Sequence, residues 1–134
     1  LENRNKLRCL FSEKPFTRIN TLTETQADEK WFNRLNEIIQ ENISNTEFSV
    51  DQLTRSVNMS RTLLYAKVKA VTGLTPNEFI RLVRLRKAAE YLAGNEYKIN
   101  EICYMVGFNS PSYFAKCFQN QFGVLPKDFI NNTN

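Results

Sequence analysis

From residue 27 onward, apolar side chains recur at the three- and four-residue spacing that places them on one face of a helix. The first run contains Trp31, Leu35, Ile38 and Ile39, and it predicts an amphipathic helix of about four turns with Asp28 as its N-cap. Shorter apolar runs follow, each bounded by Ser, Asn, Gly or Pro, the residues that begin and end helices. The pattern predicts an all-α domain over residues 28–134.

A short helix, a tight turn and a longer helix are expected after this first helix. Asn58 marks the turn because asparagine tolerates the left-handed backbone conformation. Ser60 is the expected N-cap of the longer helix, and Gly73 ends it. Pro76 then starts a long helix that extends to residue 93. Four apolar residues are expected on the inner face of the longer helix: Leu63, Leu64, Val68 and Val71.

The same order of signals then occurs a second time. Pairs at an offset of 50 residues are Ser60 with Ser110, Gly73 with Gly123, and Pro76 with Pro126. Upstream the offset is 49, and Asn109, in the turn, accounts for the extra residue. The chain therefore holds two copies of a unit of about 34 residues.

Short helix, tight turn and longer helix make up the helix-turn-helix unit. The predicted fold is two such units joined by a long central helix. Two copies are also compatible with a helical solenoid, although solenoids usually need at least three stacked repeats. The long helix between the copies weighs against direct stacking.

Charge is distributed unevenly. The whole chain carries 18 Lys and Arg against 14 Asp and Glu, a net charge of +4 that says little about partners. Residues 58–87 alone carry seven basic residues and one acidic residue, a net charge of +6. Clustered cations of this kind favour binding to nucleic-acid phosphates. The seven are Arg61, Lys67, Lys69, Arg81, Arg84, Arg86 and Lys87.

The outward face of each longer helix suits a DNA groove, because small and hydrogen-bonding side chains reach base edges there. The helix N-termini at Ser60 in the first unit, and at Asn109 and Ser110 in the second, are candidate phosphate sites. In the first unit the exposed stripe is Arg61, Thr62, Tyr65, Ala66 and Lys69. In the second it is Pro111, Ser112, Ala115, Lys116 and Gln119.

Composition excludes several classes of chemistry. The absence of His rules out Ser-His-Asp and Cys-His catalysis and any Cys/His zinc site. The cysteines at 9, 103 and 117 form no CxxC pair and are expected to be reduced, as in a cytoplasmic protein. No apolar run approaches the roughly 18 residues of a membrane helix. No enzymatic activity, cofactor, metal or membrane contact is expected.

Many positions of the second unit, in order and spacing, make the chain resemble the DNA-binding domain of the AraC/XylS family of bacterial transcription regulators. The motifs are Ile99-Asn100-Glu101-Ile102, Val106-Gly107-Phe108, Ser112-Tyr113-Phe114 and Phe122-Gly123-Val124-Leu125-Pro126. The resemblance, over about residues 28–131, implies about seven helices, sequence-specific binding and two recognition helices in successive major grooves of double-stranded DNA. It places base contacts on Thr62, Tyr65 and Ala66, and on Pro111, Ser112, Ala115 and Lys116.

The resemblance implies further context. Residues 1–27 are similar to a linker that follows the receiver domain of a hybrid two-component regulator. RNA polymerase and a homodimer formed through regions outside this chain are the partners implied besides DNA. The alternative is a helical protein-interaction module that uses the same scaffold without DNA. In that interpretation the aromatic residues of the second unit form a partner surface instead of a core: Tyr104, Phe108, Tyr113, Phe114, Phe118 and Phe122.

Overall fold

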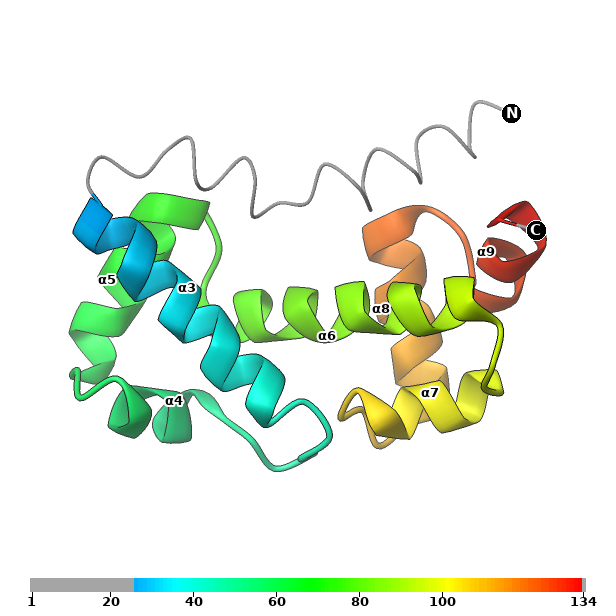
Figure 1. Cartoon of the computed structure of the whole chain (residues 1–134), viewed down its shortest axis with the longest axis horizontal. Coiled ribbons are helices and arrows are strands. Elements are labelled where there is room, and N and C mark those ends of the chain that lie inside the picture. The colour runs from blue at the N-terminus through cyan, green and yellow to red at the C-terminus, as the bar shows by residue number, and fades with distance from the viewer. Residues whose placement is uncertain (1–25, 134) are drawn as a thin grey trace.

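The computed structural model describes residues 26–133, and over that range it contains seven helices and no strand. A long helix, α6, runs between two clusters of shorter helices (Figure 1). The first cluster is α3 (Gln26–Glu41), α4 (Val50–Ser56) and α5 (Arg61–Thr72), which precede α6 (Pro76–Gly94). The second is α7 (Ile99–Met105), α8 (Pro111–Phe122) and α9 (Pro126–Thr133). The expected all-α fold of two helix-turn-helix units joined by a long helix is confirmed.

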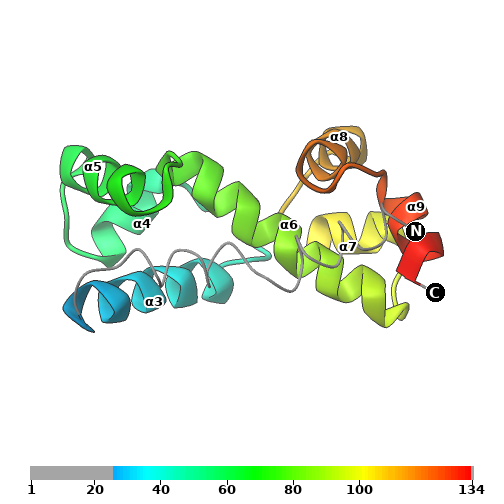
Figure 2. The ribbon, with the colours of Figure 1, turned by 90° about the horizontal axis from the view of Figure 1, so that it is seen from above.

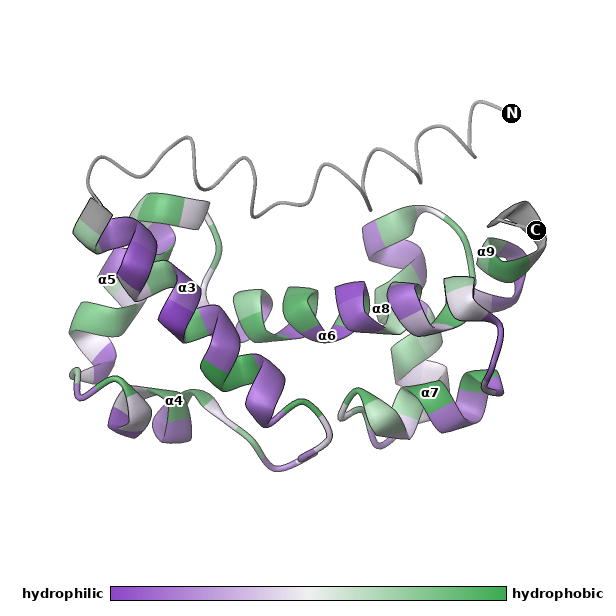
Figure 3. Ribbon diagram, viewed as in Figure 1, coloured by the Kyte–Doolittle hydropathy of each residue, from purple (hydrophilic) through white to green (hydrophobic). Residues whose placement is uncertain are grey.

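Helix α6 contributes to two hydrophobic cores because apolar residues lie at both of its ends, with a hydrophilic stretch between them (Figure 3). Its N-terminal half packs against α3 and α5, and its C-terminal half against α7, α8 and α9. The residues of α6 in the first core are Phe79, Ile80 and Val83, and those in the second are Leu85, Ala88, Ala89 and Leu92. One helix therefore holds both units.

Phenylalanine fills the second core. Phe114 and Phe118 of α8 are fully buried, and the ring of Phe118 lies 4.6 Å from that of Phe122 and 5.4 Å from that of Phe129 between centroids. Tilted and edge-to-face aromatic contacts at these distances stabilise a core beyond the area that they bury. The phenylalanines of the second unit are thus core residues, whereas Tyr104 and Tyr113 are exposed.

The helix ends follow the local signals. The Oγ of Ser60 accepts the backbone N–H of Leu63 at 3.1 Å, and the Oγ of Ser110 accepts that of Tyr113 at 3.3 Å, so both expected N-caps are confirmed. The turn inside each helix-turn-helix unit also contains one residue with positive φ. Asn58 has a φ of 54° in the first unit. Gly107 has a φ of 91° in the second.

Two expectations about individual residues are wrong. Leu63 is not on the inner face of α5, since 60% of its surface is exposed. Successive residues of a helix are rotated by about 100°, so burial of Leu64 and Val68 turns Leu63 away from the core. Asp28 is not an N-cap either, because α3 begins at Gln26. Asp28 lies in the first helical turn, where a negative charge still favours the helix dipole.

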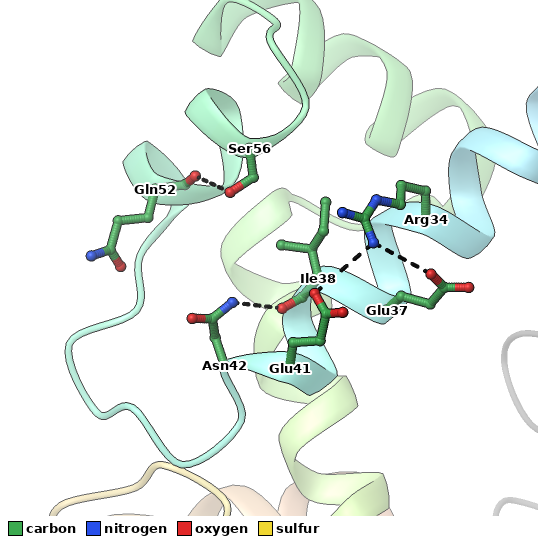
Figure 4. A network of polar contacts seen from close by, with 7 residues as sticks. All are labelled: Arg34, Glu37, Ile38, Glu41, Asn42, Gln52 and Ser56. Atoms are coloured by element: carbon green, nitrogen blue, oxygen red, sulfur yellow. Dashed lines mark hydrogen bonds and ion pairs between the residues drawn. The ribbon is translucent and has the colours of Figure 1, made fainter.

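The outward face of α3 is polar. Arg34 forms ion pairs with Glu37 at 3.4 Å and Glu41 at 3.9 Å, one helical turn or more further along (Figure 4). Beyond the helix end, Nδ2 of Asn42 donates to the carbonyl oxygen of Ile38 at 2.8 Å. The linker predicted over residues 1–27 lies almost entirely outside the described residues and stays a prediction.

Candidate nucleic-acid interface

Helices α5 and α8 lie on the same side of α6, near its two ends (Figure 2). Each is the second helix of a helix-turn-helix unit, the position of the recognition helix. Their inner faces are held by the two cores, so their opposite faces point away from the molecule. Both helices are therefore accessible on the same side of α6.

On α5, the residues of the predicted stripe are brought together. Arg61, Thr62, Tyr65 and Ala66 line a shallow hollow of about 370 Å³, and Lys69 is exposed one turn further on. The side chain of Tyr65 is 48% exposed despite its size. A half-exposed aromatic ring with a hydroxyl can both stack on a methyl group and form a hydrogen bond, so the stripe has apolar and polar contacts to offer.

On α8, the equivalent positions are also accessible. Ser112, Lys116 and Gln119 are exposed, while Pro111 and Ala115 are half-buried. The five positions coincide with those on α5 at the offset of 50 residues. The two units therefore expose the same helix positions, although the side chains at these positions differ. Lys116, for example, takes the place of Ala66.

The helix N-termini present hydroxyl groups. The Oγ atoms of Ser60 and Ser110 already accept a backbone N–H as caps, and each hydroxyl keeps its own proton to donate. Ser110 Oγ also lies 3.2 Å from the Oγ of Ser112, which joins the cap to the stripe. Asn109 is exposed immediately before this cap. These groups can contact a phosphate with the first turn of the helix.

The basic residues divide into exposed and occupied ones. Lys69 is exposed, and Arg61 is exposed in an ion pair with Asp51, a surface pair that contributes little and can open. Lys67 lies on the side of α5 that faces α3, with its Nζ 3.5 Å from Asp28 and 4.5 Å from the ring centroid of Trp31. The predicted cation cluster is thus smaller on the stripe than the sequence indicates.

Arg84, one of the seven basic residues of the predicted phosphate-facing cluster, is buried. Only 6% of its surface is exposed, and its guanidinium donates to backbone carbonyl oxygens in the interior. Burial lowers the pKa of this guanidinium from its ordinary value, and the group still stays charged because that value is so high. The expectation that Arg84 belongs to a phosphate-facing surface is wrong.

Sequence reasoning missed Tyr113 as a surface residue. Its ring is 49% exposed at the start of α8, and its Oη accepts a hydrogen bond from Nη1 of Arg81 on α6 at 3.4 Å. The repeat gave no signal for this, because Tyr113 occupies the position of Leu63, which the sequence pattern also places on the inner face and which is exposed as well. The pair ties the base of α8 to the central helix beside the stripe.

Other chemistry has little support in the described part of the chain. No group of three or more Asp, Glu or Cys residues is arranged there to hold a metal ion. Cys103 and Cys117 are buried free thiols, and burial raises the pKa of Cys103, which disfavours the reactive thiolate. Within residues 26–133, no helix has both the length and the apolar character needed to cross a membrane.

Comparison with known proteins identifies the group to which the chain belongs. A family model described as a helix-turn-helix domain matches residues 53–132, which include α5 and α8. HTH-type transcriptional regulator MtrA of Neisseria gonorrhoeae is 34% identical over 98 residues, 72% of this chain and 33% of the relative. The chain belongs to the AraC/XylS family. This membership favours a DNA-binding helix-turn-helix domain over the protein-interaction alternative.

The chain is also similar to a segment of a much longer protein and to one solved domain. Histidine kinase P4 of Formosa agariphila is 40% identical over 131 residues, 98% of this chain but 10% of that protein. The C-terminal domain of AraT, a response regulator from Geobacillus stearothermophilus, superposes with a TM-score of 0.69 at 25% identity, covering 82% of this chain and 86% of that one. The chain spans about a tenth and a third of the two curated relatives described here.

Proposed function

We propose that this chain is the output domain of a two-component regulator and that it reads an asymmetric DNA site with α5 and α8 in successive major grooves. The observation that supports this most is that α5 and α8 lie on one side of α6 (Figure 2) and that each has exposed residues at equivalent positions. A single α-helix fits the major groove, and two helices facing one way can enter the groove on consecutive turns of one DNA face.

Each stripe contributes its own base contacts. In the first, Tyr65 and Thr62 hydrogen-bond base edges or pack on thymine methyls, while Ala66 allows close approach. In the second, Lys116 and Ser112 take the same roles, Gln119 lies one turn further along, and Pro111 and Ala115 offer apolar contact. Direct reading of guanine by a bidentate arginine is limited, since only one arginine lies on either stripe, Arg61.

Phosphate contacts position the domain. Arg61 and Lys69 lie at the edges of the α5 stripe, and Ser60, Asn109 and Ser110 lie at the two helix N-termini. Lys67 adds to the local positive field while it stays paired with α3. Counterion release then makes affinity fall steeply with salt.

The two-component role rests on two likenesses. One relative that contains a segment like this chain is named a histidine kinase, and a structural neighbour is the C-terminal domain of a response regulator. In such a protein the phosphorylation switch and the homodimer contacts lie in other domains. The domain acts by binding and not by catalysis, in the cytoplasm where bacterial DNA lies, with RNA polymerase as the further partner of the bound regulator.

The proposal is tested by selecting DNA sites from a random pool and measuring affinity for the selected site and for scrambled DNA. Removing Tyr65 or Lys116 (Tyr65→Ala, Lys116→Ala) is expected to lower discrimination between the two by about 10- to 100-fold, because base contacts are worth about 1–3 kcal/mol each. Binding to scrambled DNA is expected to change much less.

Matched controls remove the same side chains elsewhere. Tyr104→Ala takes an exposed tyrosine from α7, and Lys127→Ala takes an exposed lysine from α9, outside both stripes. Neither is expected to change discrimination. If Tyr65→Ala and Lys116→Ala weakened binding to all sequences equally, the assignment of base-reading residues would be wrong. Absence of any salt-dependent DNA binding by the wild-type chain would instead remove the DNA-reading proposal.

A further inference from the structure

The buried guanidinium of Arg84 lies where the two helix-turn-helix units meet. It lies in the middle of α6, between Val83, which enters the first core, and Leu85, which enters the second. Its Nη1 donates to the carbonyl oxygens of Ile43 at 2.6 Å and Val106 at 2.8 Å. Its Nη2 donates to the carbonyl oxygen of Asn45 at 3.1 Å.

The three acceptors come from both units. Ile43 and Asn45 belong to the loop between α3 and α4, in the first cluster of helices, and this loop leads into the first unit. Val106 is the C-cap of α7 and begins the turn that leads to α8, in the second unit. The side chain of Ile43 packs against both hydrophobic cores at the same place. One side chain therefore joins the first unit, the central helix and the turn of the second unit.

Gly107 completes this junction. Its φ of 91° is costly for other residues, and a Cβ there would overlap Nη1 of Arg84 and the carbonyl oxygen of Ile43. The turn of the second unit is thus pressed against the guanidinium and the loop of the first unit. Asn58, the equivalent turn residue in the first unit, has a side chain and is exposed. The close approach is specific to the turn that meets Arg84.

Arginine suits this position for a physical reason. Its rigid planar fork holds several N–H groups in fixed directions, so it can satisfy carbonyls from two separate segments at once. A lysine has a single flexible ammonium and cannot reproduce that geometry. Burying a charge among carbonyl oxygens is costly unless the hydrogen bonds are complete, so the arrangement favours one relative position of the two units.

We propose that Arg84 is a positioning residue that fixes α8 relative to α5 and thereby sets the half-site spacing that the domain accepts. This inference rests on the proposed function for its DNA consequence. Once one recognition helix is bound, a rigid link holds the other close to its own groove, which increases the affinity for the full site. The size of this increase depends on how well the link matches the span between the two grooves. A looser link is expected to lower this increase in affinity and to let the domain bind half-sites at other separations.

The first test measures the link without DNA. Spin labels are attached to the cysteines of Ala70→Cys on α5 and Asn120→Cys on α8, in a Cys9→Ser background. Ala70 and Asn120 are exposed and lie off the stripes. The wild-type chain is expected to give one narrow distance distribution. Arg84→Met and Gly107→Ala are each expected to broaden or shift it, and Arg84→Lys to do so to a smaller degree. A narrow distribution that does not move in folded Arg84→Met would overturn the proposal.

The second test uses three duplexes: the selected full site, the same site with one half scrambled, and the full site with one base pair inserted between the halves. For the wild type, the full site is expected to bind about 100-fold more tightly than the half site. In Arg84→Met this ratio is expected to fall by about tenfold or more, while half-site affinity is retained and the penalty for the inserted base pair shrinks.

The control is Arg34→Met, which removes the same charge from the exposed face of α3 and is expected to leave the ratio unchanged (Figure 4). Equal weakening on full and half sites in Arg84→Met would show general destabilisation and overturn the positioning role. If the Met variant does not fold, Arg84→Lys and Gly107→Ala carry the same comparison. Failure of the wild type to bind DNA would contradict the proposed function and leave the spin-label result to decide the role of Arg84.

Discussion

At the scale of single residues, burial separates neighbours that look alike in the sequence. Leu63 and Leu64 are adjacent leucines in α5, yet the first is 60% exposed and the second fully buried. Lys67 and Lys69 differ in the same way, because only the former is paired with α3. The identity of a residue therefore sets what it can do, and its angle around the helix decides whether it serves the core or the surface.

The two leucines give a direct test of stability. Leu64→Ala is expected to lower the free energy of unfolding by about 2–5 kcal/mol, because it removes buried methyl groups and leaves a cavity. Leu63→Ala, the matched control, is expected to change it by about 0.5 kcal/mol or less. Urea unfolding followed by circular dichroism measures both. Similar losses for the two variants would contradict the placement of Leu63 outside the core.

At the scale of elements, the sequence predicts most of what the structure contains, because the signals for helices are local. Caps at Ser60 and Ser110, stops at Gly73 and Gly123, and apolar periodicity all act within a few residues. The role of Arg84 could not be found this way, because its acceptors lie as far as 41 residues away in the chain. The basic cluster was overestimated for the same reason: a charge count does not show which cations are buried or paired.

The start of α6 shows how a local signal makes stability depend on pH. Thr75 and Glu78 form a capping box, in which the N–H of Thr75 donates to the Glu78 carboxylate at 2.9 Å. Hydrogen bonds from the backbone and the side chain of Thr75 lower the pKa of Glu78, with a smaller contribution from nearby Lys69. The ionised carboxylate is therefore favoured in the folded state.

The expected consequence is a pH-dependent difference between the wild type and Glu78→Gln. A lowered folded-state pKa contributes stability that is fully present above the unfolded-state pKa of glutamate, about 4.3, and is lost as pH falls through the folded-state value. The wild type should therefore be the more stable at pH 7, and the difference should shrink towards zero at lower pH. Thermal unfolding from pH 7 to 3 checks this, and a difference that grew on acidification would contradict it.

At the scale of the whole molecule, the domain is two small cores on one helix. Both units pack on the central helix, so the position of α5 relative to α8 depends on the junction in the middle of α6. The stripes on the two recognition helices carry different side chains at equivalent positions. A single chain with this arrangement should prefer a DNA site whose two halves differ in sequence.

The most direct measurement of the central claim is a methylation-protection footprint of the 134-residue chain on its selected site, since guanine N7 lies in the major groove. Recognition by α5 and α8 together predicts two protected segments on one face of the duplex, about 10–10.5 base pairs apart from centre to centre, with different sequences. A single protected segment, or protection confined to the minor groove, would contradict recognition by α5 and α8 together.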